Sequence, residues 1–259
     1  MHKDLLITII TIVRNDEKNI EETIKSVINQ RDPFIEYIIV DGNSTDNTKN
    51  IIKKYISHVD KFISEPDKNL YDAINKGIAQ STGDIIGICN SGDFYKPGAF
   101  KVVRKYFDKN IKPDFFFGSI VRNYVGSTII KQGFNRKRIK VNFDAQTSIS
   151  TGFFITKEAQ NIVGEYDLNF PVSSDYDFFY RMMIKHKLNG VSSSKDEVIG
   201  EMSAGGLSSK ITYINHLIEE TKIRFKNKQN ILLIIAIILN GLFKNIKRVI
   251  LELNKKWVK

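Results

Sequence analysis

Apolar and polar positions alternate in regular blocks along the first ninety residues. The apolar, β-branched run from Leu5 to Val13 is typical of a buried strand and is too short for a signal peptide. From Ile20 to Ile28 the apolar residues recur at helical spacing, with the charges on the opposite side. We expect further strands at residues 37–40, 61–64 and 84–89, and helices near 46–56 and 70–80. Strands separated by amphipathic helices predict an α/β fold with a mainly parallel sheet.

The alternation weakens after Asp114. We expect strands near 115–121 and 152–156, a helix over 175–186, and a strand within 189–202. A helix near 211–227 then precedes the apolar run from Ile231 to Leu239. That run is well short of the roughly 20 apolar residues of a membrane-spanning helix. The pattern predicts one domain over residues 1–209, followed by a helical tail over 210–259.

Most of the net charge of +10 lies in the tail. Residues 210–259 contain 11 basic and 3 acidic side chains, which leaves 28 basic and 26 acidic ones for residues 1–209. A basic segment binds either nucleic acid or an anionic membrane. In this tail, basic residues flank the apolar run on both sides, which favours helices lying in the headgroup region of an anionic bilayer. The alternative is a helical hairpin packed on protein. No nucleic-acid motif appears, so nucleic acid is not an expected partner.

Several functional classes are excluded or disfavoured by what the sequence lacks. A single cysteine, Cys89, excludes an internal disulfide framework and a thiolate zinc cluster, and favours a reducing compartment such as the cytoplasm. The four histidines are scattered singly, without metal-ligand spacing. The glycine-rich signatures of dinucleotide oxidoreductases and P-loop enzymes and the nucleophile elbow of serine hydrolases are absent.

Polar residues directly follow the predicted strands, where open parallel sheets bind their ligands. Asp41 follows one strand and precedes Gly42, so its carboxylate is placed either to accept from a nucleobase or to form an ordinary Asx turn. Asp93 ends the sequence Asn90-Ser91-Gly92-Asp93 after another strand. It is either a turn residue or a ligand of Mg²⁺ or Mn²⁺, which proteins often hold with one or two carboxylates.

Four segments together resemble glycosyltransferase family 2. They are Thr11-Ile12-Val13-Arg14-Asn15-Asp16, the run from Ile39 to Thr48, the run from Ser64 to Gly77, and Asn90-Ser91-Gly92-Asp93. The segments occur in the family's order and spacing, and the resemblance covers roughly residues 5–210. It implies a GT-A-type fold, in which residues 1–113 bind the donor nucleotide and residues 114–209 face the acceptor. It also implies sugar transfer from a nucleoside diphosphate, with inversion at the anomeric carbon.

The resemblance also assigns roles on the donor side. It implies that Thr11, Val13 and Asp41 line the nucleoside pocket and that Asp67 and Lys68 lie beside it. Asn90, Ser91 and Gly92 would belong to the metal segment, with Asp93 as the acid that binds Mn²⁺ or Mg²⁺. This chain has Asn90 and Gly92 where acids are common in the family, so a single carboxylate remains there.

The family's catalytic base is an aspartate near the start of a later helix, and Ser173 to Arg181 resembles that segment. Asp177 is expected to pair with Arg181 four residues later. Asp175 is expected to point into the cleft and to stay ionised near the helix N-terminus, which identifies it as the base by resemblance. The alternative is a plain capping role. The position before it, usually Glu in the family, is Ser174 here.

Residues 204–209 resemble a late Gly-Gly segment of members that build bacterial polysaccharides. Gly205 and Gly206 are expected either to hinge a loop over the donor or to form a plain connector. Gln146 lies where such members carry a His-Gln pair near the acceptor, although residue 145 is alanine here.

The resulting hypothesis is a metal-dependent, inverting glycosyltransferase at the cytoplasmic face of the membrane. Its donor would be a nucleotide sugar, by family habit a UDP-sugar, and its acceptor a saccharide or lipid-linked saccharide of a surface polysaccharide. One metal acid and one base suffice for in-line displacement. The alternative is a non-catalytic sugar-nucleotide-binding scaffold of a membrane-associated assembly. A nucleotidyltransferase is disfavoured, because no glycine-rich basic loop follows the first strand.

Overall fold

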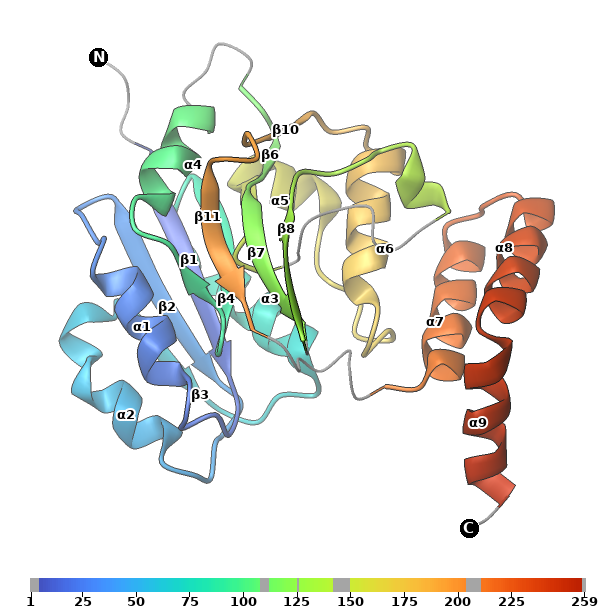
Figure 1. Cartoon of the computed structure of the whole chain (residues 1–259). Coiled ribbons are helices and arrows are strands. Elements are labelled where there is room, and N and C mark those ends of the chain that lie inside the picture. Colours follow the sequence, from blue (N-terminus) through green and yellow to red (C-terminus); the bar gives the residue numbers. More distant parts are fainter. Residues whose placement is uncertain (1–4, 108–111, 125, 142–149, 204–210, 258–259) are drawn as a thin grey trace.

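A seven-stranded sheet forms the centre of the protein (Figure 1). The computed structural model describes residues 5–107, 112–124, 126–141, 150–203 and 211–257. The strand order is β10-β6-β9-β4-β1-β2-β3. Strand β9 is antiparallel to both of its neighbours, whereas the other pairs are parallel. The sheet is therefore mostly parallel, as the alternation of strands and helices predicts.

The donor half of the chain follows the predicted order closely. Its strands are β1 (Ile7–Val13), β2 (Ile35–Asp41), β3 (Lys61–Ser64) and β4 (Ile85–Asn90). Its helices are α1 (Ile20–Ile28), α2 (Thr48–Lys54), the short helix η1 (Ile56–His58), α3 (Leu70–Gln80) and α4 (Ala99–Phe107). Helix α4 lies where the sequence pattern predicts no element.

The second half is less regular. It adds β6 (Phe115–Phe117), β9 (Phe153–Thr156) and β10 (Gly190–Ser192) to the main sheet. A smaller sheet has the order β5-β11-β7-β8 and contains β5 (Phe94–Tyr95), β7 (Ser119–Tyr124), β8 (Ser127–Lys131) and β11 (Val198–Met202). The helices are η2 (Arg138–Lys140), α5 (Lys157–Val163), α6 (Ser174–Tyr180) and the π-helical turn η3 (Arg181–Lys185).

The expected strand over 115–121 is in fact two strands in two sheets. The break falls at Gly118, where an added Cβ would lie 2.2 Å from Ile199 Cδ1. The apolar residues continue through the break, so periodicity alone does not reveal it. The expected helix over 175–186 likewise changes from an α-helix to a π-helical turn at Arg181.

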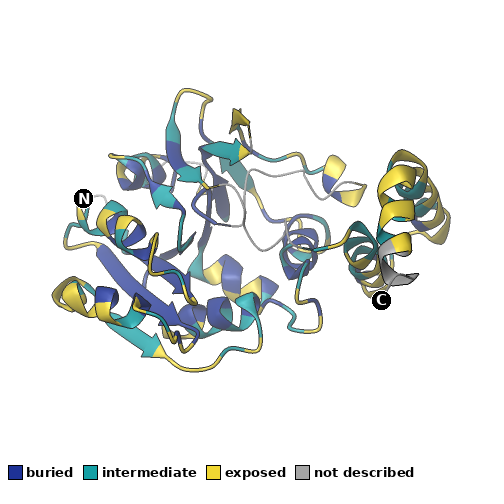
Figure 2. Ribbon diagram, turned by 60° about the horizontal axis from the view of Figure 1, so that its bottom comes forward, coloured by how far each residue is buried: buried dark blue, intermediate teal, exposed yellow. Residues whose placement is uncertain are grey.

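Two apolar clusters cover the two faces of the main sheet. Ile9 and Ile39 pack with α1, α2 and α4, whereas Ile10 and Ile38 pack with α3, α5 and α6. Figure 2 shows the resulting buried strands between half-buried helices. Each fully buried isoleucine contributes roughly 1.5–3 kcal/mol relative to an exposed one. This double-sided core explains why the strands read as continuous apolar runs.

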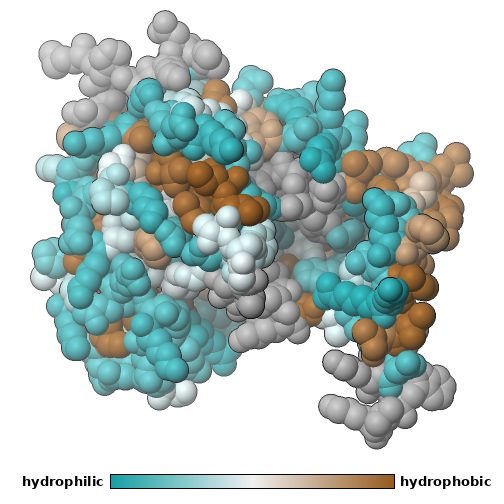
Figure 3. Space-filling view, viewed as in Figure 1, coloured by the Kyte–Doolittle hydropathy of each residue, from teal (hydrophilic) through white to brown (hydrophobic). Residues whose placement is uncertain are grey.

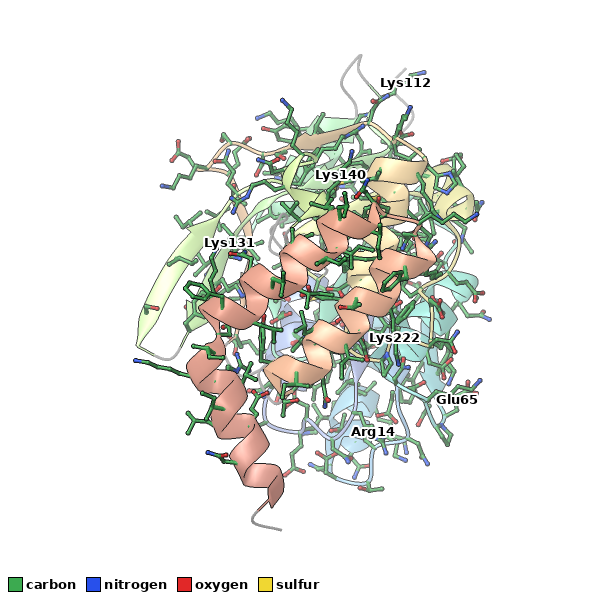
Figure 4. The ribbon with its side chains drawn as sticks, turned by 90° about the vertical axis from the view of Figure 1, so that its right-hand side faces the viewer. Arg14, Glu65, Lys112, Lys131, Lys140 and Lys222 are labelled. Carbon is green, nitrogen blue, oxygen red and sulfur yellow. The ribbon has the colours of Figure 1, made fainter. Side chains whose placement is uncertain are left out.

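Three helices form the tail: α7 (Tyr213–Lys226), α8 (Ile231–Lys244) and α9 (Ile246–Trp257). Helix α7 contacts α6, and it also contacts α8 and α9 (Figure 4). A cavity of about 590 Å³ lies between α7, α8 and the segment containing Arg138 and Val141. In the part of the chain that is described, no helix has the length and hydropathy needed to cross a bilayer.

The outer face of the tail is apolar (Figure 3). Leu232 is 73% exposed and Phe243 is 82% exposed, although Ile234 on the same helix is fully buried. Other large apolar side chains left exposed here are Ile231, Ile235, Leu239, Ile246, Ile250 and Leu251. Exposed apolar side chains gathered on one face in this way usually mark an interaction site.

Candidate active site

Four parallel strands end at one edge of the sheet, at Val13, Asp41, Ser64 and Asn90. This carboxyl edge points downward in Figure 1. Arg14 and Glu65, the residues after two of these strands, lie together at the lower part of the molecule in Figure 4. The strand-end residues chosen from the sequence on the donor side therefore share one edge.

Asp41 is fully buried at this edge. Its carboxylate accepts from the Ser44 backbone N–H at 3.1 Å, from the Ser44 hydroxyl, and from the Ser64 hydroxyl at 2.7 Å. The bonds to Ser44 span three residues, one more than in the Asx turn that the sequence offers as one interpretation. The bond from Ser64 joins the ends of β2 and β3, which makes the floor of the edge rigid.

The other donor-side residues differ in accessibility. Thr11 is fully buried, and its hydroxyl is 3.0 Å from the Tyr37 hydroxyl. Val13 is also buried, at the end of β1. Lys68 is exposed, whereas Asp67 is held by Lys76 Nζ at 2.7 Å. Lys68 is thus the one of these four whose side chain is open to solvent.

Gly42 allows close packing between two charged side chains. A Cβ at this position would lie 2.6 Å from Asp67 Oδ2 and 3.2 Å from Arg14 Cδ. The absence of a side chain therefore lets the Asp67 carboxylate and the aliphatic part of Arg14 approach the same point of the edge. Arg14 is exposed, and none of the residues in the described ranges forms an ion pair with it. A free guanidinium beside strand-end amides suits a diphosphate.

The segment from Asn90 to Asp93 is a tight turn with Gly92 at φ +90°. Ser91 donates to Asp16 Oδ2 at 2.6 Å, and the Asp93 backbone N–H donates to the Asn90 carbonyl at 3.0 Å. Thr23 bonds to both the Gly92 N–H, at 3.0 Å, and the Asp93 carbonyl, at 2.8 Å. Helix α1 therefore holds this turn in place through Thr23.

Asp93 is 6% exposed, and burial raises the pKa of its carboxyl to about 6. The Ser150 hydroxyl donates to one oxygen at 2.8 Å, and the Ser203 N–H donates to the other at 3.2 Å. Sequence reasoning missed both serines. They lie 57 and 110 residues from Asp93 and have no local signal that connects them to it.

A divalent cation fits the oxygen atoms present. The side-chain oxygen of Asn90 is buried and has no hydrogen-bond partner among the described residues. It lies in the same turn as Asp93, whose two oxygens accept one bond each in the described structure and keep further lone pairs. One carboxylate and one amide oxygen, completed by phosphates and water, form a suitable shell for Mg²⁺ or Mn²⁺. The described residues contain no cluster of three or more acidic, histidine or cysteine ligands.

Asp175 lies in the first turn of α6 and is partly buried. Its Oδ1 accepts from the Tyr71 hydroxyl at 3.0 Å and from the Tyr176 N–H at 2.9 Å. Burial raises the pKa of this carboxyl, whereas the Tyr71 hydrogen bond lowers it. Tyr71 is in the first turn of α3, which follows β3, so Asp175 lies at the same carboxyl edge as Asp93.

Asp177 has the structural role expected for it. It is fully buried, and Arg181 Nε is 2.8 Å from its Oδ2. Lys226 Nζ lies 3.0 Å from the same oxygen, and the Asn227 side-chain amide donates to Oδ1 at 2.8 Å. The predicted pairing with Arg181 is confirmed. The contacts from α7 had no signal in the sequence pattern.

The remaining candidate residues on the acceptor side are Gln146, Gly205 and Gly206. All three lie outside the described residues. Their proposed roles near the acceptor and over the donor therefore stay predictions. On α6 and η3, the apolar side chains of Tyr176, Phe179, Tyr180 and Met183 are all buried.

Solved structures of glycosyltransferases share this fold. Staphylococcus aureus TarS 1–349 in complex with UDP-GlcNAc matches with a TM-score of 0.70 and 17% identity, over 93% of this chain and 73% of that one. A Pyrobaculum calidifontis mannosyltransferase in complex with GDP-Man and Mn²⁺ matches with a TM-score of 0.61 and 13% identity, over 98% of this chain and 80% of that one. The fold is therefore of the GT-A type.

Sequence relatives agree with this assignment. Glycosyltransferase MT1564 of Mycobacterium tuberculosis is 28% identical over 177 residues, which is 68% of each chain. Escherichia coli chondroitin synthase is 25% identical over 68% of this chain and 26% of its own length. A putative teichuronic acid biosynthesis glycosyltransferase of Bacillus subtilis, TuaG, is 34% identical over 35% of this chain and 37% of its own. The profile described as "Glycosyl transferase family 2" matches residues 8–184, and the chain belongs to that family.

Proposed function

We propose that this protein is an inverting, metal-dependent glycosyltransferase that moves a sugar from a nucleoside-diphosphate donor to a saccharide or lipid-linked saccharide. One observation carries the proposal: two carboxylates in different surroundings, Asp93 and Asp175, lie at the carboxyl edge of the sheet. One belongs to the strand-end turn of the donor half, and the other begins a helix of the acceptor half. Such a pair suits leaving-group stabilisation and proton removal.

The donor nucleotide is proposed to lie across the ends of β1 and β2. Asp41, rigidly held by Ser44 and Ser64, would accept a hydrogen bond from the nucleobase. Thr11, whose hydroxyl is hydrogen-bonded to that of Tyr37, would line the nucleoside pocket beside it. Val13 and Gly42 leave backbone close to the ligand, while Arg14 and Lys68 supply positive charge at the same edge. Asp67 is proposed to orient this region through its bond to Lys76.

Asp93 and the side-chain oxygen of Asn90 would hold Mn²⁺ or Mg²⁺, with Ser91 and Gly92 shaping the turn. When bound, the cation would neutralise charge on the departing diphosphate. The protein's own contribution is the fixed turn, since α1, Ser150 and Ser203 hold its atoms before the donor arrives. Preorganised groups of this kind cost no rearrangement during the reaction.

Asp175 is proposed to take the proton from the acceptor hydroxyl. Its Oδ1 is occupied by Tyr71 and by the helix N–H, and no described residue donates to Oδ2. Oδ2 is therefore the atom available for the acceptor. A raised pKa makes a carboxylate a stronger base, which favours proton removal once the group is ionised.

The relatives support an envelope polysaccharide as the product. Two of them are a chondroitin synthase and a putative teichuronic acid biosynthesis enzyme. The neighbour that holds UDP-GlcNAc favours a UDP-sugar, and the one that holds GDP-Man makes GDP-sugars the next donors to test. The basic, apolar tail supports a peripheral position on the anionic inner face of the cell membrane.

Substitution of the base tests the proposal most directly. In Asp175→Asn, we expect transfer to fall by about 10²–10⁴-fold, the usual contribution of a general base. Donor binding should remain, measured as the thermal shift with UDP-GlcNAc or GDP-mannose and Mn²⁺. Full transfer activity in this variant would overturn the proposal. Donor binding without turnover on any acceptor fraction in the wild type would favour the non-catalytic scaffold, for which the single acid of residues 90–93 is the supporting feature.

A further inference from the structure

Helix α7 belongs to the tail in the sequence, yet it contacts the turn that leads to Asp175. Glu219 Oε2 accepts from the Val172 N–H at 3.1 Å and from the Ser173 N–H at 2.9 Å. These two residues directly precede α6. One carboxylate oxygen from another helix therefore holds the start of the helix that carries the proposed base.

Helix α6 makes no side-chain cap of its own. Ser173 occupies the N-cap position, but its side chain makes no capping hydrogen bond, and its hydroxyl has no partner in the described part of the chain. Ordinarily a serine here would satisfy one of the first N–H groups of the helix. Glu219, 46 residues further along the chain, instead anchors the two residues just before the first turn of α6.

The same turn reaches Asp175 through Tyr71. The Tyr71 hydroxyl lies 3.0 Å from the Val172 carbonyl and 3.0 Å from Asp175 Oδ1. The hydroxyl has a single proton, which the Val172 carbonyl and Asp175 Oδ1 share as acceptors. Glu219 holds the turn that carries one of these acceptors and leads directly into α6, which carries the other. A shift of this turn would change the distance between Tyr71 and Asp175.

His216 lies one turn before Glu219 on α7, and its positive charge lowers the pKa of Asp175. The other titratable groups that face Asp175 are Tyr71 from α3 and Tyr166 from the loop before α6. Burial raises the pKa of both tyrosines, so they stay neutral around Asp175. Helix α7 therefore places a histidine near this carboxyl.

We infer that Glu219 is a positioning residue for the base, and that α7 is part of the catalytic centre and not only a connection to the membrane-facing tail. This inference rests on the proposed role of Asp175. It extends that role by naming the element that sets the carboxyl's geometry.

The chain offers a matched control for Glu219. On α9, Glu252 accepts from the Tyr213 N–H at 2.8 Å and from the Ile214 N–H at 3.1 Å. It makes the same kind of contact, a carboxylate on two consecutive N–H groups at the start of a helix. Its contact is at the start of α7 and touches neither Tyr71 nor the turn before α6. Removing it is expected to loosen the start of α7 while leaving the bonds from Glu219 to the turn before α6 in place.

The test measures the pKa of Asp175 from its ¹³C carboxyl signal in aspartate-labelled protein, with Asp175→Asn for assignment. In Glu219→Ala we expect this pKa to rise by about 1 unit, because the bond from Tyr71 weakens. Hydrogen exchange of a peptide spanning residues 168–180 should also quicken. Glu219→Gln keeps an oxygen acceptor and should restore both measurements most of the way. If the alanine variant does not fold, Glu219→Ser takes its place, because the serine side chain is too short to reach the two N–H groups.

An unchanged pKa in both Glu219 variants would overturn the inference, and so would an equal rise in Glu252→Ala. None of these measurements needs a sugar donor. A failure of the proposed function would appear separately, as full transfer activity in Asp175→Asn. That outcome would exclude Asp175 as the base. If Asp175→Asn instead loses transfer while the pKa of Asp175 stays unchanged in Glu219→Ala, only the positioning role of Glu219 is excluded.

Discussion

The two carboxylates proposed to act in transfer are held in opposite ways. Asp93 belongs to a strand-end turn whose sequence already points to it, and serines add hydrogen bonds from a distance. Asp175 is placed by groups from α3 and α7, which are far from it in sequence. The comparison teaches that a donor site can be built from local motifs, whereas the base depends on the packing of the whole acceptor half and the tail.

The largest expected effect comes from breaking the junction of α6 and α7. Asp177→Ala leaves Arg181 and Lys226 without their shared buried partner, and such a loss usually costs about 3–5 kcal/mol. The free energy of unfolding in urea measures it. Asp167→Ala is the control, because its pair with Lys226 is partly exposed and is expected to change stability by less than about 1 kcal/mol. Equal losses in both variants would contradict a buried junction.

On the donor side, we expect a substitution of Asp93 to raise stability and to lower transfer activity. The folded pKa of Asp93, about 6, is higher than its ordinary value of 3.8, so the folded state loses stability as pH rises between these values. In EDTA at pH 8, Asp93→Asn should therefore be more stable than wild type, by roughly 3 kcal/mol at most. Transfer should nevertheless fall by about 100-fold. If the stability gain is as large at pH 4 as at pH 8, this explanation is wrong.

Besides Asp93, Glu220 on helix α7 is a group whose ionisation is expected to affect the free energy of unfolding. Burial raises the pKa of Glu220 from 4.5 to about 7, so wild-type stability should fall as pH rises through this window. Glu220→Gln removes the effect, and we expect it to gain about 2 kcal/mol at pH 8 after allowance for partial exposure. Thermal unfolding at pH 5 and pH 8 tests this. A constant difference between variant and wild type across the range would contradict it.

The smallest effect on stability is expected on the outer face of the tail. Leu232→Ser with Phe243→Ser should change the free energy of unfolding by less than about 1 kcal/mol, because both side chains are largely exposed. Binding to vesicles containing anionic lipid should weaken markedly, as measured by co-sedimentation. Ile234→Ser is the control on the buried face of α8 and should lose stability. Unchanged vesicle binding in the double variant would argue against a membrane contact at this face.

Much of the donor half could be predicted from sequence, because its strands are buried on both faces and its helices have a single apolar stripe. The bounds predicted for α1, β3 and α3 agree with the structure. The strands of the second half are harder to predict from the sequence, for a physical reason. The split at Gly118 depends on contact with Ile199, and β9 enters the sheet against the direction of its neighbours. Neither feature affects local periodicity.

The site shows the same division. Asp41 ends β2 and Asp93 comes shortly after β4, so their place at the edge follows from topology alone. The role of Glu219 could not be predicted, because it depends on how α7 docks against α6. The sequence interpretation treated residues 210–259 as a tail separate from catalysis, and the contacts of α7 connect that tail to the proposed base.

The antiparallel strand in the main sheet has a consequence for synthesis on the ribosome. Strand β4 pairs with β1 on one side, but its other edge is covered only by β9, which is made about seventy residues later. At roughly 5–20 residues per second, the nascent chain presents an open apolar edge for several seconds. We expect this interval to be the one in which the growing polypeptide depends most on chaperones.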